Sequence, residues 1–156
     1  MKSLNTLRGF LSRYCREYRL PFPEHLRLES SPTLVLPIRV GELLFSFQLG
    51  IRAEEEREIF SIRVPVMEVP IRRALLPLYR RLLELNDTLP GVRFSIDSSH
   101  VYLAFIHGVG ENLYGGKLTY QGFKTIMNRF FSALSRHAAA LALEFSDRER
   151  RAGAVV

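Results

Sequence analysis

The sequence predicts an α+β domain in which a five-stranded antiparallel sheet is covered by helices mainly on one face. Apolar residues recur at spacings of three and four in three segments, as in amphipathic helices. They recur at every second position in five shorter segments, as in half-buried strands. The order is helix, three strands, helix, two strands, helix. Because short turns join most strands, antiparallel neighbours are the economical arrangement.

The length of 156 residues fits one domain that can bury its core without disulfides or metal ions. We expect a single domain at residues 1–145 and a frayed tail at residues 146–156. Cys15 is the only cysteine, so an internal disulfide is excluded, and we expect its side chain to be buried. No apolar run approaches the roughly 20 residues that span a bilayer, and arginines interrupt any N-terminal signal segment. These features predict a cytoplasmic protein that has no membrane partner.

The first helix is expected at residues 4–19, where Pro21 ends the apolar repeat. Its buried stripe consists of Leu4, Leu7, Leu11, Tyr14 and Tyr18.

Three strands in a row follow the first helix. They are expected at residues 33–40, 42–52 and 57–67, with turns at Gly41 and at residues 53–56. Pro37 and Pro65 lie within the first and third of these strands. Because proline cannot donate a ladder hydrogen bond, each should lie at a sheet edge or a strand end.

Pro70 is expected to open the second helix, because its fixed φ suits a first turn. Pro77 would remove a hydrogen bond inside this helix, so the helix is either kinked at Pro77 or begins nearer Arg73 than Pro70. Its buried stripe is expected to be Ala74, Leu75, Leu78, Leu82 and Leu85.

Two strands and a long helix complete the domain. The strands cover residues 92–97 and 101–106 and are joined by a tight turn from Asp97 to His100. The last helix is expected at residues 119–144, with Thr119 as its N-cap. Its core face is expected to be Phe123, Ile126, Met127, Phe130, Leu134, Ala138 and Leu141.

The segment from Leu82 to Phe105 resembles the YbjN family and, with the order of elements, the type III secretion chaperone-like fold. A Leu-x-x-Asn sequence ends a helix at Asn86, an Arg-Phe-x-hydrophobic-Asp strand ends at Asp97, and a Val-Tyr-Leu strand begins at Val101. The resemblance implies that fold and a regulatory role. Secretion chaperones are homodimers that bind an extended segment of another protein and have no catalytic residues.

A formal charge of +6, with 19 arginines and 3 lysines, would attract nucleic acids, anionic lipids or acidic proteins. The bias toward arginine is also typical of thermophiles and of GC-rich coding. Some of this charge lies on the second helix, where we expect a partner or dimer surface. That surface comprises Arg72, Arg73, Tyr79, Arg80 and Arg81.

A glycine-rich loop precedes the last helix and is the best candidate for a ligand loop, because glycines let backbone N–H groups approach a phosphate. It comprises Gly108, Gly110, Gly115, Gly116 and Lys117. The loop matches neither the Walker A pattern nor the dinucleotide-binding pattern. The four histidines are scattered without the i, i+4 spacing of a metal site. We therefore expect no catalytic, cofactor or metal site.

These observations predict a non-enzymatic protein-binding protein, chaperone-like or regulatory. We expect a homodimer formed through the second helix or a sheet edge, which also binds another protein. Two alternatives remain open: a nucleic-acid-associated regulator that uses the arginine-rich helix face, and an enzyme built around the glycine-rich loop.

Overall fold

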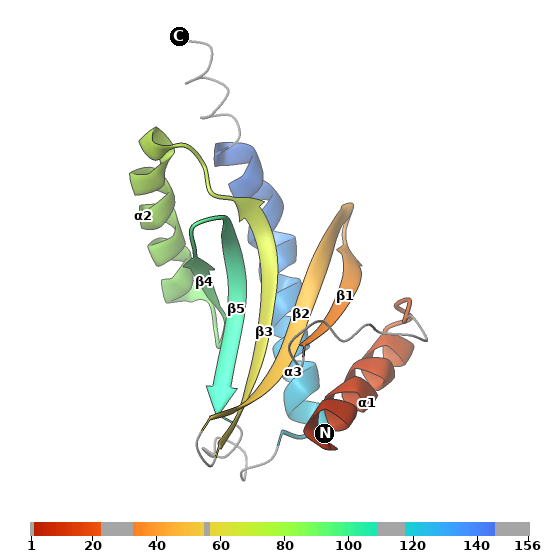
Figure 1. The fold of residues 1–156 in the computed structure, drawn as a ribbon. Coiled ribbons are helices and arrows are strands. Elements are labelled where there is room, and N and C mark those ends of the chain that lie inside the picture. Colours follow the sequence, from red (N-terminus) through yellow and green to blue (C-terminus); the bar gives the residue numbers. More distant parts are fainter. Residues whose placement is uncertain (1, 23–32, 55–56, 109–117, 146–156) are drawn as a thin grey trace.

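Residues 2–22, 33–54, 57–108 and 118–145 are described by the computed structural model of the chain. Helices and strands follow one another in the predicted order (Figure 1). They are α1 (Lys2–Glu17), β1 (Thr33–Val40), β2 (Leu43–Glu54), β3 (Arg57–Glu68), α2 (Arg72–Thr88), β4 (Arg93–Ile96), β5 (His100–Gly108), α3 (Tyr120–Ala133) and a π-helical segment, η1 (Leu134–Ala138).

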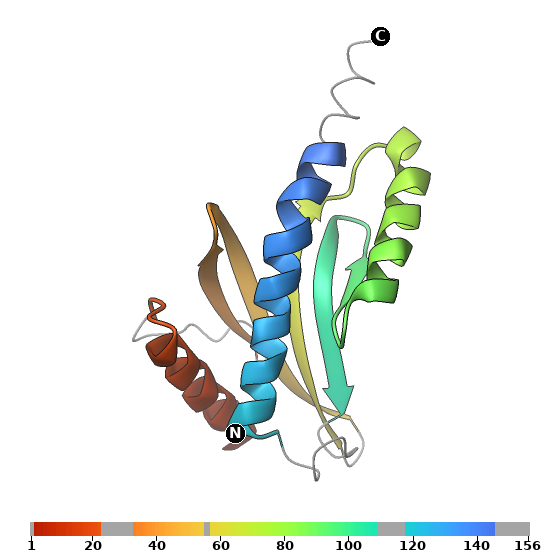
Figure 2. The same ribbon diagram turned by 180° about the vertical axis from the view of Figure 1, so that it is seen from behind.

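The five strands form one antiparallel sheet in the order β1-β2-β3-β5-β4, so β1 and β4 are its edges. Helix α3 crosses one face of this sheet, as Figure 2 shows from the helix side. Helix α1 packs against α3 and β2, while α2 lies beside β4. The opposite face, turned toward the viewer in Figure 1, carries no helix. The predicted α+β class and the one-sided placement of the helices are confirmed.

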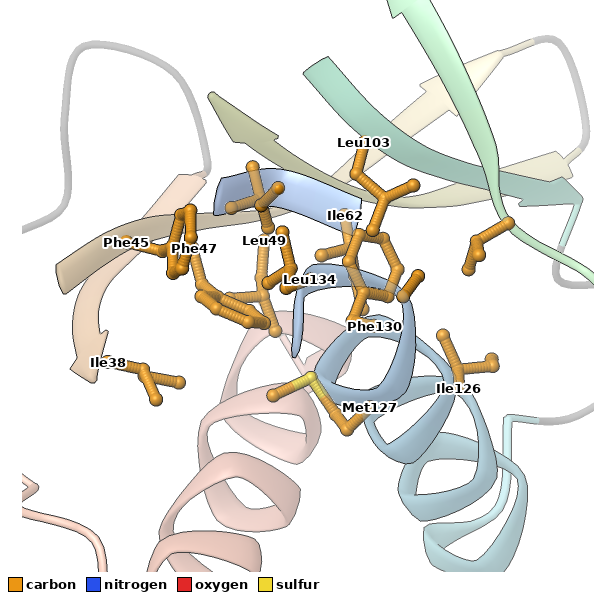
Figure 3. Packing of buried hydrophobic residues seen from close by; sticks show 14 of the residues in the cluster. Ile38, Phe45, Phe47, Leu49, Ile62, Leu103, Ile126, Met127, Phe130 and Leu134 are labelled. Atoms are coloured by element: carbon orange, nitrogen blue, oxygen red, sulfur yellow. The ribbon is translucent and has the colours of Figure 1, made fainter. Parts of the chain in front are cut away.

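One apolar core joins α3 to the sheet (Figure 3). The ring centroids of Phe130 and Phe47 lie 6.0 Å apart, and those of Phe123 and Phe60 lie 6.3 Å apart. Burial of each such ring contributes about 1.5–3 kcal/mol to folding. The buried strand residues occupy every second position: Leu34, Leu36, Ile38, Phe45, Phe47, Leu49, Ile51, Phe60, Ile62, Val64, Phe94, Val101 and Leu103.

The last helix has the predicted N-cap and core face. Thr119 Oγ1 accepts a hydrogen bond from the N–H of Gly122 at 3.1 Å, and every apolar residue assigned to the core face is buried. The π-helical turn at Leu134–Ala138 was not predicted, and residues 139–145 are α-helical again. This wider turn keeps Leu134, Ala138 and Leu141 on the face that meets the sheet.

Two of the three prolines within predicted elements occupy positions that lose little hydrogen bonding, and the third lies inside a helix. Pro37 lies on the edge strand β1, as predicted. Pro65 lies at a register shift between β3 and β5, beyond the last β2–β3 pair at Arg63. Pro77 lies inside α2, which begins at Arg72, so the helix continues through the proline.

Some boundaries and burial assignments differ from the prediction. Ala53 and Glu54, expected in a turn, extend β2 because their backbones pair with β3. Gly108, expected in the ligand loop, is a strand residue paired with Ile59. Tyr18 of the α1 stripe is exposed, whereas Cys15 is buried as expected. Tyr18 lies just beyond the end of α1 at Glu17, where its side chain is 42% exposed.

The side chain of Asn86 connects the end of α2 to the edge strand β4. Its Oδ1 accepts a hydrogen bond from the N–H of Phe94 at 2.7 Å, and its Nδ2 donates to the Phe94 carbonyl at 3.1 Å. A neighbouring strand would make the same two backbone hydrogen bonds. Asn86 therefore satisfies part of the exposed edge and fixes the end of α2 against the sheet.

We predict that Asn86→Ala lowers the free energy of unfolding by about 1–3 kcal/mol, because it leaves the N–H and C=O of Phe94 without partners. Urea unfolding followed by circular dichroism measures this loss. Ser95→Ala, at an exposed position of the same strand, serves as the control and should change stability by less than about 0.5 kcal/mol. Equal stabilities of Asn86→Ala and the wild type would contradict the proposed role of Asn86.

Candidate functional site

The outer surface of α2 is the strongest candidate for a functional site. Two leucines on it are largely exposed, Leu76 at 60% and Leu83 at 66%, and Tyr79 is 42% exposed. Exposed leucines are common singly, but two that share one helix face with a tyrosine form a patch suited to a partner. We define the α2 outer surface as Arg72, Leu76, Tyr79, Arg80, Leu83 and Asp87.

Helix geometry explains why these side chains face solvent. At about 100° per residue, Leu76 and Leu83 lie nearly above one another. The buried residues Ala74, Leu78 and Leu85 occupy the opposite side, against the core. Sequence reasoning missed Leu76, Leu83 and Asp87, because one apolar stripe already accounted for a core-facing helix. The sequence did carry one signal for them: Leu76 and Leu83 are seven residues apart and therefore lie on the same, otherwise polar, side of the helix.

The structure places four of the five predicted surface residues together and turns one away. Arg72, Arg73, Tyr79 and Arg80 are exposed on the outer half of α2. Arg81 instead lies on the flank near His137 of the last helix, whose pKa it lowers, and it forms an exposed 3.5 Å ion pair with Glu84. Such a pair contributes little stability. Arg81 therefore belongs to the boundary between the two helices rather than to the centre of the surface.

A shallow groove of about 280 Å³ separates α2 from the end of the last helix. It is lined by Leu76, Pro77, Arg80, Arg81, Glu84 and Glu144. Further along this boundary, His137 of the π-helical turn is half-buried. Its burial lowers the pKa of the imidazole, and the positive charges of Arg81 and Arg136 lower that pKa further.

Arginines on the helix-free face of the sheet differ from those on α2 because they interact within the chain. Arg63 stacks over the ring of Tyr102 at 3.9 Å and lies 3.5 Å from the carboxylate of Asp97. Arg93 donates to the carbonyl of Leu89 at 2.5 Å. By contrast, Arg72, Arg73 and Arg80 form no ion pair or hydrogen bond with another described residue. Arg72 and Arg80 therefore leave positive charge available on the α2 outer surface.

The edges of the sheet are poorly suited to bind an extended peptide. At β4, Asn86 already occupies the backbone groups of Phe94. At β1, the two-residue turn makes Val40 and Leu43 a hydrogen-bonded pair. Along an antiparallel strand, the backbone groups of successive residues point alternately toward the neighbouring strand and away from it. The backbone of Pro37, three positions before Val40, therefore points toward the free edge, where proline presents no N–H. Neither edge offers an uninterrupted row of donors.

The largest polar cluster of the described residues joins α1 to α3. Tyr14 donates to Asn128 Oδ1 at 2.9 Å, and Glu17 accepts hydrogen bonds from both Tyr120 and Lys124. The hydrogen bond from Lys124 is the main cause of the lowered pKa of Glu17. Because these groups satisfy one another, the cluster fixes α1 in place and leaves no group aimed at a ligand.

Other kinds of site find no support among the described residues. No three His, Cys, Asp or Glu side chains there come together as a metal site would require. None of the helices within these residues is both long and apolar enough to span a membrane. Gly110, Gly115, Gly116 and Lys117 of the predicted ligand loop lie outside the described residues, so that prediction stays untested.

Comparisons with known proteins identify one family. A family model named YbjN, described as "Putative bacterial sensory transduction regulator", matches residues 5–143. Among solved structures, the chain is similar to one described as "Crystal structure of YbjN, a putative transcription regulator from E. coli". The identity is 15% and the TM-score 0.49, over 85% of this chain and 91% of that one. The search of curated proteins found no match.

We predict that His137 makes the folded state less stable as the pH falls. Its pKa is lowered in the folded protein, so the unfolded chain binds the proton more tightly. The stabilisation is complete above the unfolded pKa of about 6.5, begins to be lost as the pH falls below that value, and is fully lost once the pH falls through the lowered pKa of the folded state. Melting temperatures measured from pH 7.5 to about pH 5 should therefore fall more steeply for the wild type than for His137→Gln.

Arg81→Gln provides a second check on the cause. Removing this neighbouring charge should raise the pKa of His137 toward its ordinary value and give a slope between those of the wild type and His137→Gln. Identical slopes for all three proteins would show that His137 is not responsible.

Proposed function

Because the chain belongs to the YbjN family, we propose that it is a non-enzymatic regulatory protein that binds a protein partner through the α2 outer surface. The family description supports regulation in general terms. The observation that carries the proposal is the pair of leucines, 60% and 66% exposed, on the side of α2 that faces away from the core. Exposing them to water is unfavourable unless a partner covers them.

The composition of the surface favours a protein over a nucleic acid. Its centre is apolar, with Leu76, Tyr79 and Leu83, and the arginines lie around it. Protein interfaces commonly combine an apolar or aromatic centre with a polar rim, and they are enriched in Tyr and Arg. A phosphate backbone would instead require a row of cations, and the carboxylate of Asp87 lies on the same face. The nucleic-acid alternative therefore takes second place.

The proposal predicts that charge at the centre of the surface abolishes partner binding. Photo-crosslinking in cells, from an unnatural residue placed at Arg73, should yield a discrete adduct with the wild type. Leu83→Glu should reduce this adduct at least about tenfold, because it places an unpaired carboxylate in an apolar contact.

Leu44→Glu is the matched control for Leu83→Glu. Leu44 is a leucine of similar exposure, 63%, on strand β2 of the helix-free sheet face. The Leu44→Glu substitution should leave the amount of cross-linked adduct unchanged. If the Leu83→Glu variant still forms the adduct in the same amount, the proposal is wrong. Salt-sensitive binding of oligonucleotides, lost on Arg80→Ala but retained in Leu83→Glu, would favour the nucleic-acid alternative.

A further inference from the structure

We propose that residues 146–156, which we call the tail segment, dock in the groove and on the α2 outer surface of their own chain, and that a partner protein must displace them. This inference rests on the proposed function and concerns the regulation of that site. The tail segment lies outside the residues that the structure describes. Its place in the chain, its composition and the surface beside it carry the inference.

The tail segment follows the last helix directly beside the α2 outer surface. Glu144, two positions before the segment, lines the shallow groove together with Leu76 and Arg80. The end of the last helix and the first turns of α2 lie side by side in both views of the fold (Figure 1, Figure 2). A short tether gives a segment an effective concentration in the millimolar range, so weak contacts are enough to dock it.

The tail segment is long enough to cross α2. An extended chain spans about 3.3–3.6 Å per residue, so its first seven residues reach roughly 23–25 Å. A helix with its side chains is about 10–12 Å across. The remaining four residues therefore lie within reach of the outer side of α2, which faces away from the core.

The chemistry of the tail segment changes along its length in the same order as the surface. Residues 147–151 are all charged, whereas residues 152–156 are alanine, glycine and valine. With distance from the last helix, the groove with its four charged side chains comes first. The apolar part of the α2 outer surface follows, beginning with Leu76, which belongs to both. Charged residues of the segment thus meet the groove, and its apolar residues meet the leucines.

The charges of the segment and the groove are complementary. Acidic and basic residues alternate in the segment: Asp147, Arg148, Glu149 and Arg150. The groove also presents both signs: Arg80, Arg81, Glu84 and Glu144. Arg80 forms no ion pair with another described residue, so it is available to a carboxylate of the segment. A segment of one sign would be repelled by half of the groove, whereas alternating charges pair with both halves.

The apolar residues of the segment cover side chains that are otherwise in water. Leu76 is 60% exposed and Leu83 is 66% exposed, and removing such surface from water is favourable. Val155 and Val156 supply most of the apolar area of the segment. A partner binds only the fraction of chains in which the surface is uncovered, so the segment lowers the apparent affinity of the site.

Cross-linking within the purified chain tests the docking. A photo-crosslinking residue placed at Val155 should form an intrachain cross-link that mass spectrometry maps to residues 72–88. Leu83→Glu should reduce its yield at least about tenfold, because the segment would then meet an unpaired carboxylate. Leu44→Glu, on the helix-free face of the sheet, is the matched control and should leave the yield unchanged. A cross-link that maps elsewhere, that joins two chains, or that is insensitive to Leu83→Glu would overturn the docking.

Partner binding in cells tests the regulation. Val155→Asp, and deletion of residues 146–156, should each raise the amount of partner adduct formed from Arg73 at least about threefold, because the surface is uncovered in more chains. Ser146→Ala keeps the segment and should leave the adduct unchanged. Circular dichroism checks that each variant is folded. If both Val155→Asp and the deletion leave the adduct unchanged or lower it, the segment does not restrict the site.

The failures of the two proposals are distinguishable. The purified chain contains no partner, so absence of the intrachain cross-link overturns the docking and leaves the proposed function untouched. Conversely, a partner adduct that is insensitive to Leu83→Glu overturns the proposed function, whereas the intrachain cross-link still reports whether the segment docks on α2.

Discussion

The packing of α3 across one face of the sheet is the constraint on which the rest of the structure depends. Phe123, Met127 and Phe130 are fully buried between α3 and the strands. Because this one helix takes the middle of the sheet, α1 and α2 are left to its two sides, as Figure 2 shows. A helix in such a position contacts the core along one stripe. Its outer side is therefore open to solvent or to a partner.

Helix α2 is held in that position by packing and by a specific polar contact. Ala74, Leu78 and Leu85 bury its inner side, and Asn86 binds the backbone of Phe94 at its end. The same asparagine occupies the free edge of β4, which lowers the tendency of that edge to pair with another chain. Asn86 thus fixes the position in which α2 exposes its outer side, and it also disfavours pairing of the β4 edge with a strand of another chain.

The arginines of the chain differ in whether they interact with other residues of the fold, and this difference shows which of the positive charges remain available to a partner. Arg63 is engaged with Asp97 and Tyr102, and Arg93 with backbone carbonyls between α2 and β4, so their charges serve the fold. Arg72 and Arg80 have no such partners among the described residues and lie around exposed leucines. Net charge alone would point to nucleic acid, whereas this arrangement, with Asp87 at one end, is better matched by a protein surface.

The sequence by itself determined the class of the fold, the order of its elements, the core face of α3, the core face of α2 except for the half-buried Leu75, and the exposure of Arg72 and Arg80. These properties follow from periods of 2 and 3.6 residues and from prolines and caps, which act locally. It did not determine the π-helical turn, the two hydrogen bonds of Asn86, the position of Arg81 beside His137, or the exposure of Leu76 and Leu83. Each depends on which neighbour a side chain meets. The sequence alone does not distinguish a leucine that faces the core from one on the opposite side of the helix. Only the tertiary structure decided which side of the helix the core would cover.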